Sequence, residues 1–427
     1  MQFLSILTIT IFYFISALCF AYFFKREKIT PVTIFVISQA LFFAGFIKFL
    51  NLRSQEDYKI VLIYLIGLAS FCAGSLFDRL MHPTRVSSKC FVSKPISKYS
   101  LTISLAIVLA SFLLFVFFCY RTRLATIRIM LDNLLGRANS DITESRLASY
   151  EVPGTAIIYA FRIALLPTIT IALIRKENRI PFFAKVILTL FMVFFSLITG
   201  QRGGFVYVML MWILSYLIPI FSKPKDSAIK KQRKNIIVII FAMVVVFFFM
   251  SLINGRVSGS LFGELFSRFF NDNQRTAYYG FHYIFENGTC WGRNYYEEAI
   301  NVIVPGDKYL PLSKIIFEIM YGSTRGTAPV CLWGSVFYNF SWIGVVIFGF
   351  IYGVLCHYIG FVFYNKQSNS LRLVIYSYMF IDLGMLMAGG PFQLFNNGFV
   401  PLLILLLVLR LGKNNNSTLF DLKRKTT

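Results

Sequence analysis

The sequence predicts an all-α integral membrane protein with about eleven transmembrane helices and two larger outward-facing segments. Of its 427 residues, 57% are hydrophobic and only 14% are charged, which leaves more apolar surface than a soluble core can bury. Apolar runs of about 20 residues, the length that crosses a bilayer, recur along nearly the whole chain. Basic residues gather in alternate connections between these runs. We therefore expect one transmembrane domain covering residues 1–427.

The apolar runs define the predicted spans in chain order. The first run is too long for the apolar part of a signal peptide, and no small-residue cleavage site follows it. We therefore take it as a membrane span. Hydropathy places the spans near residues 3–24, 31–50, 60–78, 99–120, 155–174, 181–199, 204–221, 235–254, 338–363, 371–389 and 394–411.

The charges of the connections predict the orientation. Connections after odd-numbered spans are basic, as in KREK and RKENR, whereas the short even-numbered ones carry few positive charges. Cytoplasmic loops are the ones rich in Lys and Arg, so the N-terminus faces outward and the C-terminus faces the cytoplasm. Segments 121–154 and 255–337 then face outward, as does the short turn TGQRGGF at 199–205. The formal net charge of +23 comes largely from the cytoplasmic connections.

Segment 121–154 predicts a helix lying in the membrane interface. Its leucines and isoleucine recur at helical spacing, flanked by arginines, as an interfacial helix requires. The apolar positions are Leu124, Ile127, Leu131, Leu134 and Leu135, and the arginines are Arg121, Arg123, Arg128 and Arg137.

Segment 255–337 carries the most specific candidate residues. Arg256 opens it, and Arg268, Arg275 and His282 follow at intervals of seven. Within one helix this spacing places the three on one face. Arginine binds phosphate oxygens in a bidentate way, and histidine can accept a proton from a hydroxyl. A solvated face of an amphipathic helix is the alternative interpretation.

Two further arginines stand beside glycines on the predicted outer face. Arg202 lies in the turn TGQRGGF and Arg325 in YGSTRGTAPV. Glycine lets a backbone approach a ligand closely, so two such turns can cradle an anion. Arg162 and Asp382 lie inside predicted spans, where a charge usually faces a cavity or pairs with another residue. The arginines of the outer half indicate an anionic ligand at the outer leaflet, such as a lipid-linked pyrophosphate.

Several classes of function lack their usual residues. The sequence has no Walker-type loop for ATP and no Cys/His metal cluster, so we expect neither cofactor nor metal. No acidic pair lies within a span, as many proton-coupled transporters would require. We interpret His357 as a packing residue, and no nucleic-acid partner is expected.

The chain resembles the bacterial O-antigen or oligosaccharide repeat-unit polymerases of the Wzy type. The resemblance lies in the turn Gly200-Gln201-Arg202-Gly203, in the large late outward loop, and in the stretch GTAPVCLWGSVFYNFSWIGVVIFGFIYG. Two positions depart from the family pattern. Ser341 follows Asn339-Phe340 where glycine is frequent, and Ser335 stands where an acidic residue is often found.

The resemblance implies a metal-independent glycosyltransferase of the bacterial inner membrane that works at the periplasmic face. Such enzymes polymerise repeat units carried on undecaprenyl pyrophosphate, with a flippase and a chain-length regulator as partners. Together with the residue patterns above, it leads us to expect catalysis by Arg202, Arg275 and His282, with His282 as the base that deprotonates the attacking sugar hydroxyl. Binding of pyrophosphate or glycan falls to Arg162, Arg256, Arg268 and Arg325.

Three other functions remain open at this stage. An O-antigen ligase, which transfers glycan from the same carrier to lipid A-core, would share the arginines and the topology. A flippase or exporter of the lipid-linked unit would line a path with charges at several depths. A metal-dependent glycosyltransferase would use Glu56 and Asp57 of the first outer loop.

Overall fold

In the computed structural model, the part of the chain that the structure describes is helical and contains no β-strand, as the sequence predicts. Six of its helices are long and apolar enough to cross a membrane, which fits a membrane-embedded protein. The described residues are 1–83, 95–135, 152, 154–199, 202–222, 237, 241, 271–303, 309–323, 326–365 and 369–410.

Long helices account for most of the predicted spans. The six are α1 (Gln2–Glu27), α2 (Pro31–Phe46) continued by η1 (Ile47–Phe49), α3 (Gln55–Met81), α4 (Lys98–Thr122), the run Ile157–Ile174, and α16 (Leu332–Asn365). The run Ile157–Ile174 is built from α7 (Thr155–Ala160), the π-helical turn η3 (Phe161–Leu165) and α8 (Leu166–Ile174).

Shorter helices match the other predicted spans. They are α9 (Phe182–Leu197), α10 (Arg202–Ser222), α17 (Ser370–Gly384) and the helix Phe399–Arg410. Every predicted span coincides with a helix except 235–254, which lies outside the described residues apart from 237 and 241. The number of helices that cross the membrane, and their orientation, stay predictions.

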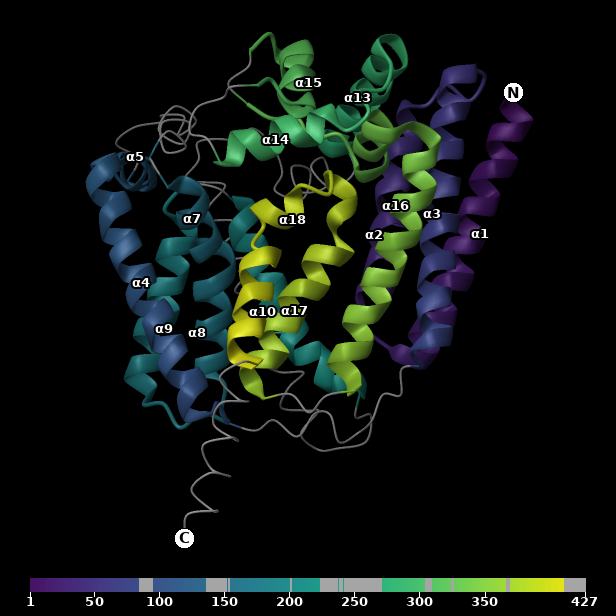
Figure 1. Cartoon of the computed structure of the whole chain (residues 1–427). Coiled ribbons are helices and arrows are strands. Elements are labelled where there is room, and N and C mark those ends of the chain that lie inside the picture. The colour runs from purple at the N-terminus through teal and green to yellow at the C-terminus, as the bar shows by residue number, and fades with distance from the viewer. Residues whose placement is uncertain are drawn as a thin grey trace.

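The helices of the predicted outward segments gather at one end of the bundle. They are α5 (Ala125–Leu134), α13 (Asn273–Asn287), α14 (Arg293–Ile303) and α15 (Leu312–Tyr321). Figure 1 shows α13, α14 and α15 at the end where α1 begins, with α14 lying across the bundle. This is the arrangement that the predicted topology requires. α5 is the helix expected in 121–154, whereas Arg137 lies outside the described residues.

Glycines set the closest helix pair, α3 against α16. A Cβ on Gly353 would lie 2.1 Å from the Phe71 carbonyl oxygen, and one on Gly74 would lie 2.0 Å from that of Phe350. The Ser75 hydroxyl donates to the Gly353 carbonyl at 3.1 Å. Small residues of this kind let membrane helices approach backbone to backbone. The two helices therefore pack in direct backbone contact.

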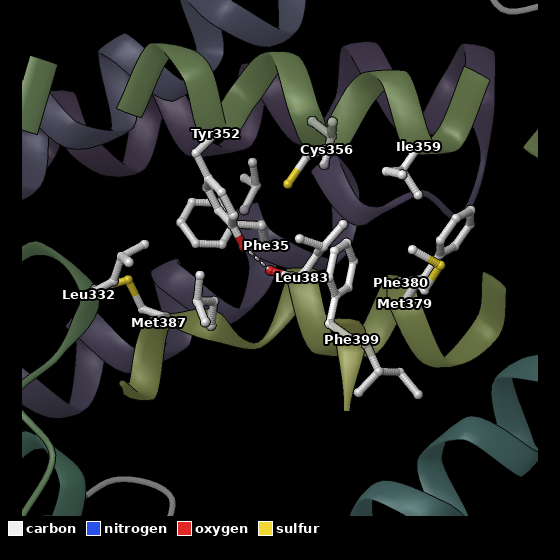
Figure 2. Packing of buried hydrophobic residues seen from close by; sticks show 14 of the residues in the cluster. Phe35, Leu332, Tyr352, Cys356, Ile359, Met379, Phe380, Leu383, Met387 and Phe399 are labelled. Atoms are coloured by element: carbon white, nitrogen blue, oxygen red, sulfur yellow. Dashed lines mark hydrogen bonds between the residues drawn. The ribbon is translucent and has the colours of Figure 1, made fainter. Parts of the chain in front are cut away.

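α17 ends inside the bundle, and its end is fixed by α16. Figure 2 shows Tyr352 of α16 pointing at that end, where its hydroxyl donates to the Leu383 carbonyl. Beyond Gly384 the chain forms η5 (Leu386–Ala388) and the short α18 (Gln393–Asn396). We refer to residues 385–398 as the C-terminal outer loop.

Two local features of the outward part differ from the sequence expectations. α16 starts at Leu332 rather than near residue 338, and it consists of two helices joined at Ser341, whose φ is +56°. That conformation favours glycine, the residue frequent there in Wzy-type polymerases. Gly280 lies within α13, where Val330 packs 2.6 Å from the position that a Cβ would take.

Candidate functional site

Arg162 holds the start of the Gly-x-Arg-Gly turn from inside the protein. Its side chain is fully buried, and Nη1 donates to the Ser196 carbonyl at 2.8 Å and to the Thr199 hydroxyl at 2.5 Å. The guanidinium also lies over the Tyr159 ring, 4.5 Å from its centroid. These contacts fix the end of α9 and the residue that precedes Gly200. The buried arginine therefore fixes the residue that leads into the turn, whose Gly200 and Gln201 lie outside the described residues.

The local sequence explains why Arg162 reaches the turn. It lies in η3, where a π-helical turn interrupts the α-helix and changes the direction of the side chain; such turns are frequent at functional sites. On the other side, a Cβ on Gly204 would lie 2.7 Å from Ile163 and 3.6 Å from Arg162 Nη2. Gly204 therefore lets the first turn of α10 pack directly on Arg162.

Arg202 is the first residue of α10. The first backbone N–H groups of a helix have no partner within the helix, and the helix dipole is positive there. With two glycines following, this end of α10 has the makeup of an anion-binding helix N-terminus. The direction of the Arg202 side chain is not among the described features, so its contact with an anion stays a prediction.

A group of polar side chains surrounds Arg162, and we call it the Arg162 cluster. Its members are Tyr159, Arg162, Tyr207, Tyr378, Asp382 and Asn397. The Tyr378 hydroxyl lies within electrostatic range of both Arg162 and Asp382, and it donates to the Asn397 carbonyl. The Asn397 amide donates to the Tyr207 hydroxyl at 3.4 Å. The cluster thus joins α10, α17 and the C-terminal outer loop.

Arg162 and Asp382 share this cluster without a direct ion pair between them. Asp382 is fully buried, and neither of its oxygens has a hydrogen bond of ordinary geometry among the described residues. The Asn397 side chain faces the carboxylate. A buried carboxylate without a charged partner is costly in a membrane protein.

His282 lies in a different part of the outer end. Its Nδ1 is 3.4 Å from Glu56 Oε2 and its Nε2 is 3.4 Å from Asp57 Oδ1, at the start of α3. Asp57 is buried and accepts the Asn51 backbone N–H at 2.5 Å. In Figure 1, α13 lies on the α1–α3 side of the bundle, away from α7. The structure therefore does not bring His282 to the Arg162 cluster.

The geometry around His282 does not favour the alternative of a metal-dependent glycosyltransferase that uses Glu56 and Asp57. The two carboxylates lie against different nitrogens of one imidazole ring. A metal ion needs ligand atoms that converge on one point, and these three side chains do not. Tyr278 packs on the ring at 4.4 Å between centroids. Burial, Asp57 and Glu56 raise the Tyr278 pKa, so its phenol stays neutral beside the carboxylates.

The remaining predicted arginines fall into two groups. Arg275 lies on α13, as His282 does, and is exposed, with its guanidinium 5.8 Å from the Tyr279 ring centroid. Arg256, Arg268 and Arg325 lie outside the described residues, so their place in the site stays a prediction.

A second polar group lies under α14, beside the kinked start of α16. The Tyr295 hydroxyl is 3.2 Å from Ser335 Oγ, and the Asn339 side-chain oxygen accepts the Tyr295 backbone N–H at 3.3 Å. Burial raises the pKa of Glu298, one turn further along α14, to about 7. This part of the outer end thus provides an acid whose charge changes near neutral pH.

Sequence reasoning missed a buried network at the opposite end of the bundle. His357 was interpreted as packing, but its Nδ1 is 2.6 Å from Asp78 Oδ2 and its Nε2 is 3.2 Å from Glu27 Oε1. Arg79 Nη1 lies 3.3 Å from the same Glu27 oxygen. The acidic residues sit near the ends of two predicted spans, which was the available signal. The network joins α1, α3 and α16.

Comparison of the chain with protein-family models, with curated proteins and with solved structures found no match.

Proposed function

We propose that this protein is a glycosyltransferase of the bacterial inner membrane that polymerises undecaprenyl-pyrophosphate-linked oligosaccharide units at the periplasmic face. The observation that carries the proposal is the turn at the start of α10, which the buried Arg162 holds from below. The turn combines a helix N-terminus, two glycines and Arg202. A pyrophosphate anchored in the outer leaflet is a ligand that suits this combination.

The turn would act on the leaving group of the reaction. When the bond between the sugar and the pyrophosphate breaks, negative charge develops on the pyrophosphate oxygens. Donors fixed in advance around that charge lower the barrier more than donors that must reorganise. Arg202 is the residue proposed to contact the pyrophosphate. Arg162 is proposed as a positioning residue, because its guanidinium is fully buried against Ser196, Thr199 and Tyr159.

The backbone of α16 also supports the resemblance to Wzy-type polymerases. Ser341 adopts a backbone conformation suited to glycine, the residue frequent at that step in the family. The other partners of the proposal follow from the resemblance, namely a flippase and a chain-length regulator. Arg256, Arg268, Arg275 and Arg325 remain proposed ligands of the pyrophosphate or glycan.

His282 is the less favoured of the proposed catalytic residues. Each of its ring nitrogens faces a carboxylate, and α13 lies across the bundle from α7. A base must be within hydrogen-bond reach of the proton that it removes. If the pyrophosphate lies at the turn, His282→Ala should retain polymer, whereas loss of polymer with normal protein abundance would return His282 to the mechanism.

The test is a gel of surface lipopolysaccharide from a strain lacking the gene, complemented with variants. The polymerase proposal predicts collapse of the ladder to core plus one repeat unit in the deletion strain. Arg202→Ala should be abundant and inactive, and Arg202→Lys should restore activity only partly, because a point charge does not replace a planar fork. A normal ladder with Arg202→Ala would contradict the assignment.

The same gel separates the two nearest alternatives. Loss of even the single-unit band would favour a ligase or a flippase, and polymer accumulating on undecaprenyl pyrophosphate would identify the ligase. The positions of the buried charges concern the flippase alternative, which requires charged residues along a path through the bundle.

The described buried ionisable groups lie at both ends of the bundle. Those of the His357 network are paired with one another, which does not favour a charged path there.

A further inference from the structure

Asp382 is a buried carboxylate that forms no ion pair with any residue that the structure describes. It is fully buried, and neither oxygen completes a hydrogen bond of ordinary geometry within the part of the chain that the structure describes. The buried acids and bases of the His357 network, by contrast, are joined by direct contacts of 2.6 to 3.3 Å. Buried polar groups without partners are rare and usually have a specific cause.

The position of Asp382 in its helix adds a second cost. α17 ends at Gly384, so Asp382 lies in its last turn, where the helix dipole disfavours negative charge. An ionisable residue inside a membrane bundle is by default a functional candidate. Here burial and the helix end both act against the carboxylate, and among the described residues the Asn397 side chain offsets only part of that cost.

Asp382 lies beside the turn that the proposed function uses. Tyr207, close enough to Asp382 for a direct electrostatic influence, is on α10, five residues after Arg202. That separation is about 7.5 Å along a helix axis. On the other side, Tyr378 connects Asp382 with Arg162. The carboxylate and the proposed pyrophosphate site thus share one cluster.

The C-terminal outer loop covers this carboxylate. Its Asn397 side chain faces the Asp382 carboxylate, and Asn397 also forms hydrogen bonds with Tyr378 and Tyr207. Glycines lie near both ends of the loop, at 389, 390 and 398, and Gly398 has φ +95°. Residues that absorb large changes of φ and ψ permit loop opening. Release of Asn397 would expose Asp382 on the side of the turn.

We propose that Asp382 is the catalytic base of the transferase, an inference that rests on the proposed function. A hydroxyl at the non-reducing end of the incoming unit gives its proton to an Asp382 oxygen. The hydroxyl oxygen bonds to the anomeric carbon of the growing glycan, and the bond from that carbon to the pyrophosphate breaks. The electron pair leaves with undecaprenyl pyrophosphate at the turn, and Asp382 later releases its proton to water.

The experiment uses the full-length protein in liposomes with lipid-linked repeat units, and measures turnover, binding of undecaprenyl pyrophosphate and thermal stability. Asp382→Asn should lower turnover by about 100-fold or more, with binding unchanged and stability at least equal to wild type. Added formate should partly restore Asp382→Ala, since it can occupy the vacated space, but should not restore Asp382→Asn. Asp78→Asn, a matched buried carboxylate at the other end, should lose stability rather than turnover per folded molecule.

Other results would overturn the inference. Wild-type turnover in Asp382→Asn excludes the base role, and a parallel fall of turnover, binding and stability without formate rescue shows a structural role. The same assay distinguishes failure of the base assignment from failure of the proposed function. If the proposed function is wrong, the wild-type protein itself will form no polymer from lipid-linked units.

Discussion

Replacing Arg162 with lysine tests whether the buried guanidinium positions the turn. Lysine keeps the charge, but it lacks the planar fork that serves Ser196 and Thr199 and lies flat over Tyr159. A hydrogen bond from a charged donor contributes about 1.5–3 kcal/mol, and a desolvated cation–π contact about 2 kcal/mol. Because lysine retains part of these contacts, we expect the free energy that keeps the turn ordered to fall by about 2–4 kcal/mol.

That loss translates into function through the population of the ordered turn. At about 1.4 kcal/mol per tenfold, the estimated loss lowers the equilibrium constant for ordering the turn by roughly 30- to 700-fold, and binding of undecaprenyl pyrophosphate falls by up to that factor. The assay is binding of undecaprenyl pyrophosphate to the protein in liposomes, with thermal unfolding of the same sample. The lipopolysaccharide ladder of the complemented strain gives the cellular consequence.

The chain offers a matched control in Arg175. Its side chain is also buried, its Nη1 donates to the Ser215 carbonyl at 3.2 Å, and its guanidinium lies 5.0 Å from the Tyr216 ring centroid. It sits at the other end of the same run of helix. Arg175→Lys should lower stability by a similar amount and leave binding per folded molecule unchanged. Equal losses of binding in both variants, or none in Arg162→Lys, would refute the positioning role.

Four further predictions concern the scaffold and the outer end. Ser341→Gly should raise stability by about 1 kcal/mol, because the positive φ is strained for a residue with a Cβ; a lower unfolding temperature would contradict this. Gly353→Leu should prevent assembly of α3 on α16, since its Cβ would meet the Phe71 carbonyl oxygen at 2.1 Å, and the yield of monodisperse protein measures it. His357→Gln should lower the free energy of unfolding by about 3–5 kcal/mol, because the buried carboxylates of Glu27 and Asp78 lose their shared partner. Recovery of stability when both carboxylates are also replaced by amides would confirm this cause. The raised pKa of Glu298 means that the folded protein binds its proton more tightly than the unfolded chain, so stability should fall as pH rises from 4.5 to about 7 and level off above, and Glu298→Gln should remove that slope in thermal unfolding.

Local hydropathy was enough to find most of the fold. Long apolar runs form helices because each satisfies its own backbone hydrogen bonds, so the described helices that match the predicted spans follow from the sequence alone. The residues at which helices begin and end were harder to predict from the sequence. The start of α16 at Leu332 and the kink at Ser341 depend on contacts with α13 and α14, which hydropathy does not contain.

The candidate site depends on contacts that join distant segments. Asp57 and His282 meet across the chain, as do Asp78 and His357, which are 279 positions apart. No local pattern marks such partners. The charge of Arg162 within a predicted span marked it as unusual in the sequence. Its contacts beside the turn depend on the π-helical η3 and on the close packing of Gly204. Its role therefore required the three-dimensional arrangement.

The most direct test of the central claim is transfer by the purified protein. The full-length protein in liposomes receives lipid-linked repeat units alone, and glycan length and released undecaprenyl pyrophosphate are measured together. The account predicts multi-unit glycans with one undecaprenyl pyrophosphate released per bond formed, and neither product with Arg202→Ala. Absence of multi-unit glycan from the wild-type protein, or an unchanged yield from Arg202→Ala, would contradict it.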